Sequence, residues 1–280
     1  MIVIRACKGF DELEACVNLQ VEVWGYCEGD VIPRRAFLVA QKIGGQVLGA
    51  FDNALPGAPE QGDAASMVGF ALALPGVKTG DKSSTGQPQS YLHSHMLAVK
   101  DGYRNQRIGA RLKLAQREDA LKRGIERIEW TFDPLEIKNS FLNIHKLGAI
   151  VRSYEPDFYG VSSSRLQGGL PTDRLLAEWW LSAPRVRAAI EGSPVPTQVG
   201  PAQGLHEPER QVQGELDSII VPATIYHWKA EEQLRHLALE VQSGNRVKFQ
   251  NAFSRGLAVV DFGRDPAGNG IFYLGKWPEP

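Results

Sequence analysis

Cysteine is scarce in this chain of 280 residues. The three cysteines, Cys7, Cys16 and Cys27, are odd in number and show neither CxxC nor Cys/His spacing. This pattern argues against a disulfide framework and against a zinc site, and it is typical of proteins in a reducing compartment. We therefore expect a cytoplasmic protein without a bound metal.

Long apolar runs and an excess of charge of one sign are also missing. No uninterrupted run approaches the ~18 apolar residues of a membrane span. The first residues show no basic region followed by an apolar one, so we expect no signal peptide. Lys and Arg number 31 against 32 Asp and Glu, a formal net charge of −1. No global field therefore draws the protein to nucleic acid or to an anionic membrane surface.

The remaining composition is that of an ordinary globular protein, with 43% hydrophobic and 22% charged residues. Residues 1–182 alternate strand-like apolar runs with amphipathic helical patterns. Residues 183–216 are rich in proline and polar residues, which predicts a linker with a short helix. Residues 217–280 regain a β-α-β-β pattern. We therefore predict a main domain over 1–182, a linker over 183–216 and a small C-terminal extension over 217–280.

Spacing of apolar residues predicts the elements of the main domain. Helices are expected over 10–24, 33–43, 108–123 and 139–147. Strands are expected over 2–6, 46–51, 67–74, 91–99, 125–132, 149–155 and 173–181. Residues 75–90 are expected to form a long polar loop.

The segment from His93 to Leu112 is the most informative part of the sequence, because it reads as a strand, a tight turn and a helix. The free N–H groups at a helix start and the helix dipole both favour a bound anion, and basic residues lie in the same turn. Gly109 leaves room for phosphates to approach the backbone. The turn is neither a P-loop nor the dinucleotide G-x-G-x-x-G motif.

Residues Arg104 to Gly109 resemble the pyrophosphate loop of the GNAT superfamily of CoA-dependent N-acyltransferases, Arg/Gln-x-x-Gly-x-Gly/Ala. Arg107 stands in the place of the first glycine, which a non-glycine residue can occupy if the backbone stays helical. Asn139 to Ala149 is similar to that family's Asn…Lys-Leu-Gly-Phe helix, and the element order over 1–181 also matches. The chain thus resembles a little-characterised bacterial subgroup of this family that carries a C-terminal extension.

The resemblance implies an α/β fold of mixed α+β type, with a central mixed twisted sheet flanked by helices. It implies acetyl-CoA or another acyl-CoA as co-substrate and no metal. The fourth strand is expected to bulge, the backbone to bind the pantetheine arm, and the loop amides to bind the pyrophosphate. The residues implied in acyl-CoA binding are Leu97, Ala98, Val99, Arg104, Asn105, Gln106, Arg107, Ile108, Gly109, Ala110 and Asn139.

His93 and His95 are the candidate bases, since residues two apart on a strand share a face. An alkyl amine with a pKa of about 10.4 is neutral in only roughly one of 2,500 molecules at pH 7, so a base helps the attack. A His-x-His before Leu-Ala-Val also resembles the arylalkylamine N-acetyltransferases. An unperturbed imidazole titrates near 6.5, which predicts a rise of kcat/KM through about pH 6–7.5.

The family's usual acid, a tyrosine, is replaced here by Ile144. The thiolate must then take its proton from Tyr154, from Tyr159 or from solvent.

Asp133, Trp24 and Glu28 are the candidate acceptor-binding residues. Asp133 ends the fifth strand, where it could hold an ammonium group; the alternative is a turn-capping role before Pro134. Trp24 and Glu28 lie in or near the first interhelical loop, which often shapes the acceptor site in this family. The alternative for Trp24 is a place in the core.

The sequence therefore predicts an enzyme that moves an acetyl or related short acyl group from acyl-CoA to a small-molecule primary amine by direct attack. Two alternatives stay open: an N-succinyltransferase acting on amino acids, and a catalytically silent CoA-binding module. The acceptor, the acyl donor, a homodimeric state and the role of 183–280 are not decided by the sequence.

Overall fold

The computed structural model describes residues 1–78, 88–192 and 217–277. The chain forms two compact units, Met1–Glu129 with Ser163–Leu166 and Trp130–Ser162 with Gln167–Pro280. Each is described by itself. The predicted boundaries at 182/183 and 216/217 do not coincide with this division, and residues 193–216 of the predicted linker lie outside the described residues.

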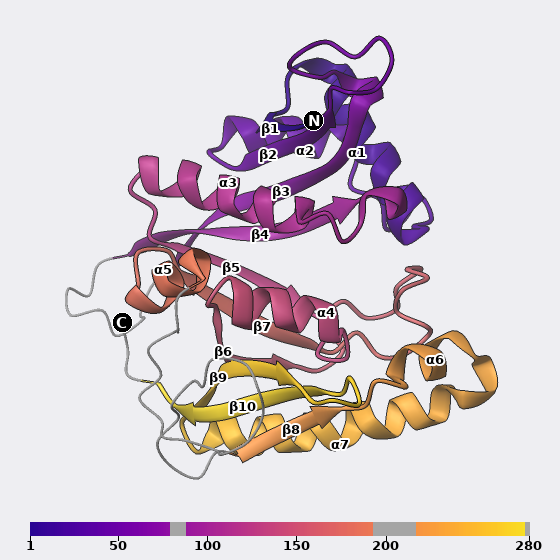
Figure 1. Ribbon diagram of the computed structural model, residues 1–280, viewed down its shortest axis with the longest axis vertical. Coiled ribbons are helices and arrows are strands. Elements are labelled where there is room, and N and C mark those ends of the chain that lie inside the picture. The colour runs from indigo at the N-terminus through magenta and orange to yellow at the C-terminus, as the bar shows by residue number, and fades with distance from the viewer. Residues whose placement is uncertain (79–87, 193–216, 278–280) are drawn as a thin grey trace. The chain divides into compact units, whose positions relative to one another are not determined.

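The first unit is built on strands that follow the order β1-β2-β3-β4-β5 (Figure 1). Their bounds are Ile2–Ala6 for β1, Gln46–Asp52 for β2, Met67–Lys78 for β3, Gln89–Val99 for β4 and Arg127–Phe132 for β5. Neighbours are antiparallel except β4 and β5, which are parallel. The expected long loop over 75–90 is wrong in its extent, because β3 continues to Lys78 and β4 begins at Gln89.

Three helices accompany these strands: α1 (Gly9–Trp24), α2 (Arg34–Lys42) and α3 (Ile108–Lys122). Met96 and Ala98 of β4 pack in the cluster that holds the buried residues of α1 and α2. Leu97 and Val99, which alternate with them, pack in the cluster that contains Ile108 and Leu112 of α3. Since successive strand residues face opposite sides, α3 covers the other face of the sheet from α1 and α2.

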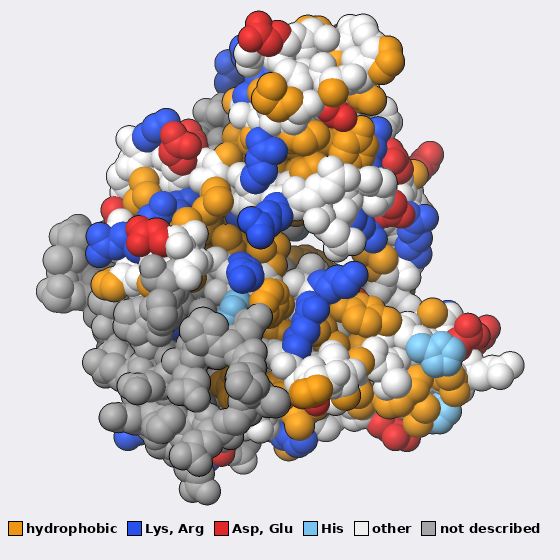
Figure 2. Space-filling model, viewed as in Figure 1, with side chains coloured by type: hydrophobic (Ala, Val, Ile, Leu, Met, Phe, Trp, Pro, Cys, Tyr) orange, Lys and Arg blue, Asp and Glu red, His pale blue; other side chains and the backbone are white. Residues whose placement is uncertain are grey.

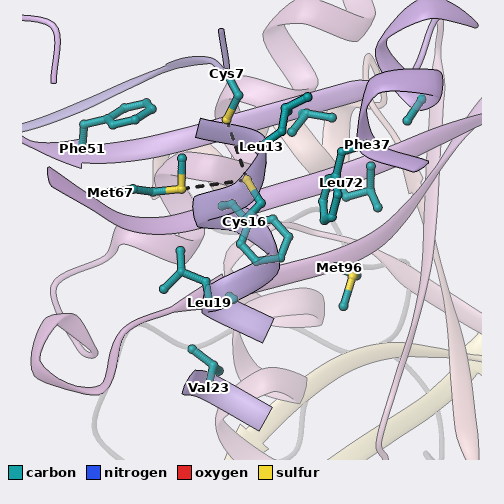
Figure 3. Packing of buried hydrophobic residues seen from close by; sticks show 14 residues of the cluster. Cys7, Leu13, Cys16, Leu19, Val23, Phe37, Phe51, Met67, Leu72 and Met96 are labelled. Atoms are coloured by element: carbon teal, nitrogen blue, oxygen red, sulfur yellow. Dashed lines mark hydrogen bonds between the residues drawn. The ribbon is translucent and has the colours of Figure 1, made fainter. Parts of the chain in front are cut away.

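The core on the α1 side shows why residues 9–24 form a helix. Leu13, Cys16, Leu19 and Val23 recur at helical spacing and are buried, and Figure 3 shows them facing Phe51, Met67 and Leu72. Gly25 ends the helix with a left-handed backbone, φ +70°, and its N–H donates to the carbonyl of Val21 over 2.9 Å.

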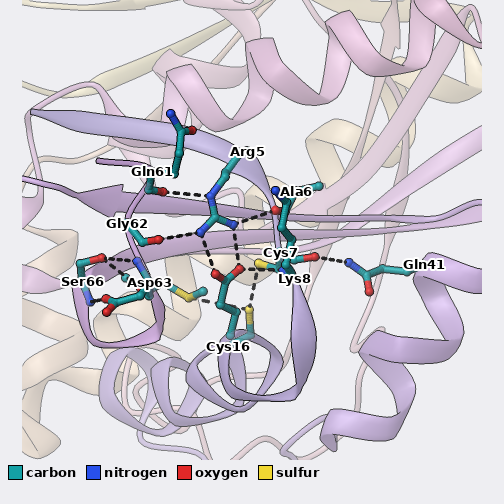
Figure 4. A network of polar contacts seen from close by, with 12 residues as sticks. Arg5, Ala6, Cys7, Lys8, Cys16, Gln41, Gln61, Gly62, Asp63 and Ser66 are labelled. Atoms are coloured by element: carbon teal, nitrogen blue, oxygen red, sulfur yellow. Dashed lines mark hydrogen bonds and ion pairs between the residues drawn. The ribbon is translucent and has the colours of Figure 1, made fainter. Parts of the chain in front are cut away.

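A buried ion pair fixes the start of α1 against β1. The Arg5 guanidinium donates to both carboxylate oxygens of Glu12 over 2.8 and 2.7 Å, and also to the carbonyls of Gln61 and Gly62 (Figure 4). Glu12 also accepts from the Lys8 N–H over 2.7 Å. Burial alone would raise the pKa of Glu12, but these hydrogen bonds hold it below its ordinary value.

In the second unit the strand order is β7-β6-β9-β10-β8. The strands are β6 (Ile150–Glu155), β7 (Arg174–Trp180), β8 (Asp217–Val221), β9 (Leu257–Arg264) and β10 (Gly270–Lys276), and the helices are α4 (Ile137–Ser140), α5 (Pro184–Glu191), α6 (Ile225–Ala230) and α7 (Arg235–Ser254). β6 pairs with β7 and, through Val151↔Val259, with β9. The C-terminal β8-α6-α7-β9-β10 segment therefore extends the sheet that β6 and β7 begin.

The predicted helix over 139–147 differs in form. A short helix, α4, is followed by a π-helical stretch over Phe141–Lys146, in which the Leu147 N–H donates to the carbonyl of Leu142. Gly148 has φ +75°, as expected for the residue that ends a helix, and a Cβ there would lie 3.0 Å from Val186 Cα of α5. Among the described residues, no helix is both long enough and apolar enough to cross a membrane.

Candidate active site

A β-bulge interrupts β4 at the candidate histidines. Leu72 pairs with Met96 and the next residue of β3, Ala73, pairs with Ser94, so β4 carries one extra residue, His95. A bulge breaks the strict alternation of side chains and bends the strand. The resemblance implies a bulge in this strand, and the structure has one.

The register of β3 and β4 decides where the backbone groups beyond the bulge point. The Lys100 N–H donates to the carbonyl of Val68 over 2.9 Å, which makes that pair a hydrogen-bonded one. In an antiparallel ladder such pairs alternate with pairs that exchange no hydrogen bond. Phe70↔Ala98 is then bonded, whereas Ala71↔Leu97 and Gly69↔Val99 are not. The N–H and C=O groups of Leu97 and Val99 therefore point away from β3.

This register corrects the prediction for Ala98. Its backbone groups are used in the ladder with β3 and its side chain is buried, so Ala98 offers no polar group on the side that Leu97 and Val99 face. The parallel ladder from β4 to β5 consists of Leu92↔Ile128 and His93↔Glu129 and stops before the bulge. The peptide groups of Leu97 and Val99 are thus placed to bind an extended ligand.

The loop before α3 has an unusual backbone. Asn105 and Arg107 have φ values of +63° and +59°, in the left-handed region that favours glycine. The condition that the backbone at Arg107 stays helical is not met, because the position has the left-handed conformation for which a glycine is best suited. Arg107 is the N-cap of α3 and no side chain caps the helix. Helix geometry leaves the first N–H groups, those of residues 108–110, without intrahelical acceptors.

The loop and the bulged strand are in contact. A Cβ built on Gly109 would meet a single neighbour within 4 Å, the Leu97 Cδ2 atom at 3.4 Å. Arg104, Arg107 and Arg111 are exposed here, although Arg104 pairs with Asp101 over 2.8 Å. Figure 2 shows blue Lys and Arg side chains scattered over the part of the first unit where α3 runs. The helix start therefore offers N–H donors in a basic setting, beside the peptide groups of β4.

Gly109→Val is expected to weaken CoA binding roughly tenfold or more, about 1.4 kcal/mol, because the side chain fills the space between the helix start and Leu97. The melting temperature should change little, since an added Cβ meets only the far end of a leucine. Calorimetric titration with CoA measures the effect. Gly244→Val, a helical glycine of α7 with open space around it, is the control. A folded Gly109→Val variant with an unchanged Kd would rule out this loop as the phosphate site.

The two histidines lie close together and both are largely shielded from water. Their ring centroids are 5.9 Å apart, with the planes tilted by 41°. Burial lowers the pKa of His95 below its ordinary value of 6.5. Burial, and then the positive charges of His95, Lys113 and Lys78, lower the pKa of His93 to about 4. Both rings are therefore neutral at pH 7, and the expected rise through pH 6–7.5 moves to lower pH.

Two residues near this pair escaped the sequence reasoning. Ser94, between the histidines, accepts a hydrogen bond from the Lys113 Nζ of α3 over 2.8 Å. Its hydroxyl donates to Gln116 of the same helix over 3.0 Å. Part of this hydrogen-bond network could have been recognised from the sequence, because Lys113 and Gln116 are polar residues one turn apart next to the buried Leu112. A polar residue on a core-facing stripe indicates a buried hydrogen-bond network.

Tyr154 is not placed to donate a proton. Its hydroxyl donates to the Asp173 carboxylate over 2.5 Å, and Arg246 holds that carboxylate with two hydrogen bonds of 2.9 and 2.8 Å. Burial first, and then the bond to Asp173, raise the pKa of Tyr154 above its ordinary value. The ring also stacks on Phe249 at 5.6 Å. The structure thus gives Tyr154 a place in the core of the second unit, in disagreement with the predicted acid role.

The Asp133 carboxylate is also engaged by other groups of the chain. The buried Lys229 of α6 donates to Asp133 over 2.9 Å and to Glu136 over 2.8 Å, and the Leu135 N–H donates to Asp133 over 2.8 Å. Burial alone would lower the pKa of Lys229, but the two carboxylates raise it above its ordinary value. The chain's own ammonium group takes the position predicted for an acceptor amine. The turn-capping alternative for Asp133 fits the Leu135 contact.

Trp24 and Glu28 are the remaining candidates for binding the acceptor. Trp24 packs at the edge of the first core, stacked on Tyr26 at 5.4 Å and edge-on to Phe70 at 6.3 Å, so the core alternative describes it. Glu28 is exposed in the loop after α1. That loop is bound to the short segment 163–166, because Ser163 donates to Asp30 over 2.5 Å and the Arg165 N–H donates to the Trp24 carbonyl over 3.0 Å.

Within the second unit, Asn139 is exposed on α4 and Ile144, in the place of the family's tyrosine, is completely buried. Tyr159 is 43% exposed, and its hydroxyl lies 2.8 Å from the Thr131 hydroxyl of β5. The residues that the structure brings together in one unit are therefore the histidine pair, the open edge of β4 and the 104–110 loop. Asp133, Asn139 and Tyr154 belong to the other unit.

No family model matches the sequence, and no curated protein matches it either. Solved structures do. The structure of Arabidopsis thaliana NAA60 in complex with acetyl-CoA is 13% identical, with 65% of this chain and 100% of that chain covered and a TM-score of 0.53. For the ribosomal-protein-S18-alanine N-acetyltransferase from Escherichia coli the identity is 15%, the covered shares are 65% and 96%, and the TM-score is 0.47. The similarity to the NAA60 structure confirms the predicted mixed α/β sheet flanked by helices.

Proposed function

We propose that this chain, which has a GNAT-like fold, moves an acetyl or related short acyl group from acyl-CoA to a small-molecule primary amine. One observation carries the proposal: the peptide groups of Leu97 and Val99 face away from β3, next to an uncapped helix start. An extended strand edge suits the amide-rich pantetheine arm, and the helix start suits the pyrophosphate. Gly109 keeps the space between them open.

The chemistry of this arrangement is direct transfer. The thioester is supplied by acyl-CoA. The acceptor nitrogen forms a bond to the thioester carbon, and the bond from that carbon to sulfur breaks, which releases the CoA thiolate to be protonated by water. A backbone N–H on the open edge of β4 can stabilise the oxyanion that develops on the carbonyl. His95 or His93, neutral at pH 7, takes the proton that the amine loses.

Each of the two alternative functions differs from the proposed one in a single feature. An N-succinyltransferase acting on amino acids would use the same strand edge and loop with another acyl group and acceptor. A catalytically silent CoA-binding module would use them without chemistry, and the buried Ile144 in the place of the family's acid is the observation that favours it. The neutral histidine pair favours the enzyme, since a ring without a proton can accept one.

The decisive experiment measures free thiol released from acetyl-, propionyl- and succinyl-CoA across a panel of amines and amino acids. We expect release that depends on one acyl-CoA and on a primary amine. His95→Ala protein, which should still bind CoA, is the control for spontaneous thioester hydrolysis. Measurable CoA binding without release for any pair would favour the silent module. Acceptor identity, cytoplasmic location and a homodimeric state stay predictions.

A further inference from the structure

The helix α3 carries a stripe of residues that follows β4. Gly109, Lys113 and Gln116 are four and three residues apart, so they lie on one side of the helix. Gly109 lies against Leu97 of β4. Lys113 and Gln116 both bind Ser94, which lies three residues before Leu97 on the same strand. One helix face therefore contacts the open strand edge with its first turn and the histidine bulge with its second.

The contact at the bulge is a directed hydrogen-bond chain. Because the Ser94 hydroxyl donates to the Gln116 side-chain oxygen, its lone pairs are left for the Lys113 amine, which donates over 2.8 Å. Ser94, Lys113 and Gln116 are all buried, with exposed fractions of 5%, 4% and 0%. A buried network of this kind holds its members in one arrangement, since breaking it strands polar groups away from water.

The bulge is the part of β4 that needs such support. His93 pairs with Leu74 of β3 and with Glu129 of β5, but the extra residue His95 is paired with no residue of β3, so the register alone does not fix where the His95 ring points. Ser94, the residue between the histidines, pairs with Ala73 of β3 through its backbone, and its side chain is tied to α3.

We propose that Lys113 is a positioning residue for the histidine pair: through Ser94, which lies between the two histidines, it fixes the bulge at His95. The role in catalysis rests on the proposed acyl transfer, whereas the effect on the histidines is a property of the folded chain. Burial lowers the pKa of Lys113 well below its ordinary value, so its amine takes up a proton at lower pH than an exposed lysine does.

The charged side chains on the strands next to His93 are paired with one another. On β5, the Glu129 carboxylate is paired with both Lys78 of β3, at 2.6 Å, and Arg127. On β4 itself, the neighbours are His95 and Tyr91. The charges that act on His93 are those of His95, Lys113 and Lys78, and all three oppose its protonation. Lys113 is the one that comes from α3, the helix that begins at the phosphate loop.

The test is an NMR titration of the histidine ring signals in the full-length protein, which needs neither substrate nor activity. Lys113→Met keeps the length of the side chain and removes the amine. We expect the ring signals of His95 and His93 to shift, because Ser94 loses the hydrogen bond that holds it against α3. Lys122→Met, at an exposed lysine on the same helix paired with Glu118, should leave these signals at their wild-type positions. A folded Lys113→Met protein with unchanged histidine ring signals overturns the proposal.

A second measurement covers the case in which Lys113→Met fails to fold. The Lys113 Nζ and Cε signals of the wild-type protein should titrate well below those of the exposed lysines, and an ordinary lysine titration would overturn the proposal without any variant. Ser94→Ala tests the positioning role itself. We expect the fold decrease in kcat to exceed the fold increase in the KM for acyl-CoA. If the histidines respond as expected but no thiol is released from any acyl-CoA, the acyl transfer fails and the Lys113 assignment stands.

Discussion

Replacing His95 by alanine is expected to lower kcat/KM for the best amine roughly 100-fold, the usual contribution of a positioned general base. The Kd for CoA should stay near the wild-type value, because the phosphate contacts are made by the helix start and not by the ring. His93→Ala should have a smaller effect if that ring only relays a proton to water. His236→Ala, at an exposed histidine of α7, is the control.

The pH dependence follows from the sign of the shift. A base works in its neutral form, and burial lowers the pKa of His95 below 6.5, so the ring stays competent further into acid than a free imidazole. After correction for the acceptor's own titration, kcat/KM should be level above about pH 6.5 and fall below it. That fall should vanish in His95→Ala. If His95→Ala retains both the rate and the acid limb, the base lies elsewhere, and Glu28 becomes the next candidate.

A chain that stops after Ala183 is expected to lose soluble expression. β6 would lose its partner strand β9, and the ring cluster formed by Tyr154, Phe249, Phe262 and Phe272 would keep only its tyrosine. An unpaired strand edge next to exposed aromatic surface favours aggregation. Asp173 would also lose Arg246 and remain as a buried charge. Solubility and size-exclusion profiles measure the outcome, and a monodisperse truncation with an unchanged melting temperature would contradict it.

A single substitution tests the packing of the same C-terminal segment without removing it. Phe249→Ala removes a completely buried ring that contacts Tyr154 and Phe272, which should cost about 3–5 kcal/mol of unfolding free energy. Val247→Ala, two residues earlier and 64% exposed, is the matched control and should be nearly neutral. Denaturant unfolding of both variants separates the packing of the C-terminal segment from any general effect of changing α7.

Local pattern was enough to predict the loop and the strand that form the candidate site. Arg104 to Gly109 and the His-x-His pair depend on residues close in sequence, and the structure places them in one unit. Predictions that depended on distant partners did worse. Tyr154 donates to Asp173, which Arg246 holds from 73 residues further along the chain, and Asp133 is engaged by Lys229, 96 residues further along. Single-sequence reasoning has no access to such pairings, because spacing within a helix or strand says nothing of which element packs against it.

The bulge shows a related limit. His93 and His95 were expected on one face from simple alternation, yet His95 is itself the extra residue of the bulge, which breaks that alternation. The ring centroids are nevertheless 5.9 Å apart. The pKa of the pair was likewise expected near 6.5, because the sequence does not show how deeply the rings are buried or that Lys113 and Lys78 lie close.

The left-handed backbone at Arg107 bears on how this loop can change by mutation. A non-glycine residue there costs roughly 1–2 kcal/mol, which is small enough for a folded protein of ordinary stability to tolerate. The strand before the loop and the helix after it hold this backbone in place, so a residue other than glycine can occupy the position at that cost. The amino acid at this position therefore says less about the loop than its backbone does. Two left-handed residues, two positions apart and directly before a helix, describe such a loop better than any one amino acid in it.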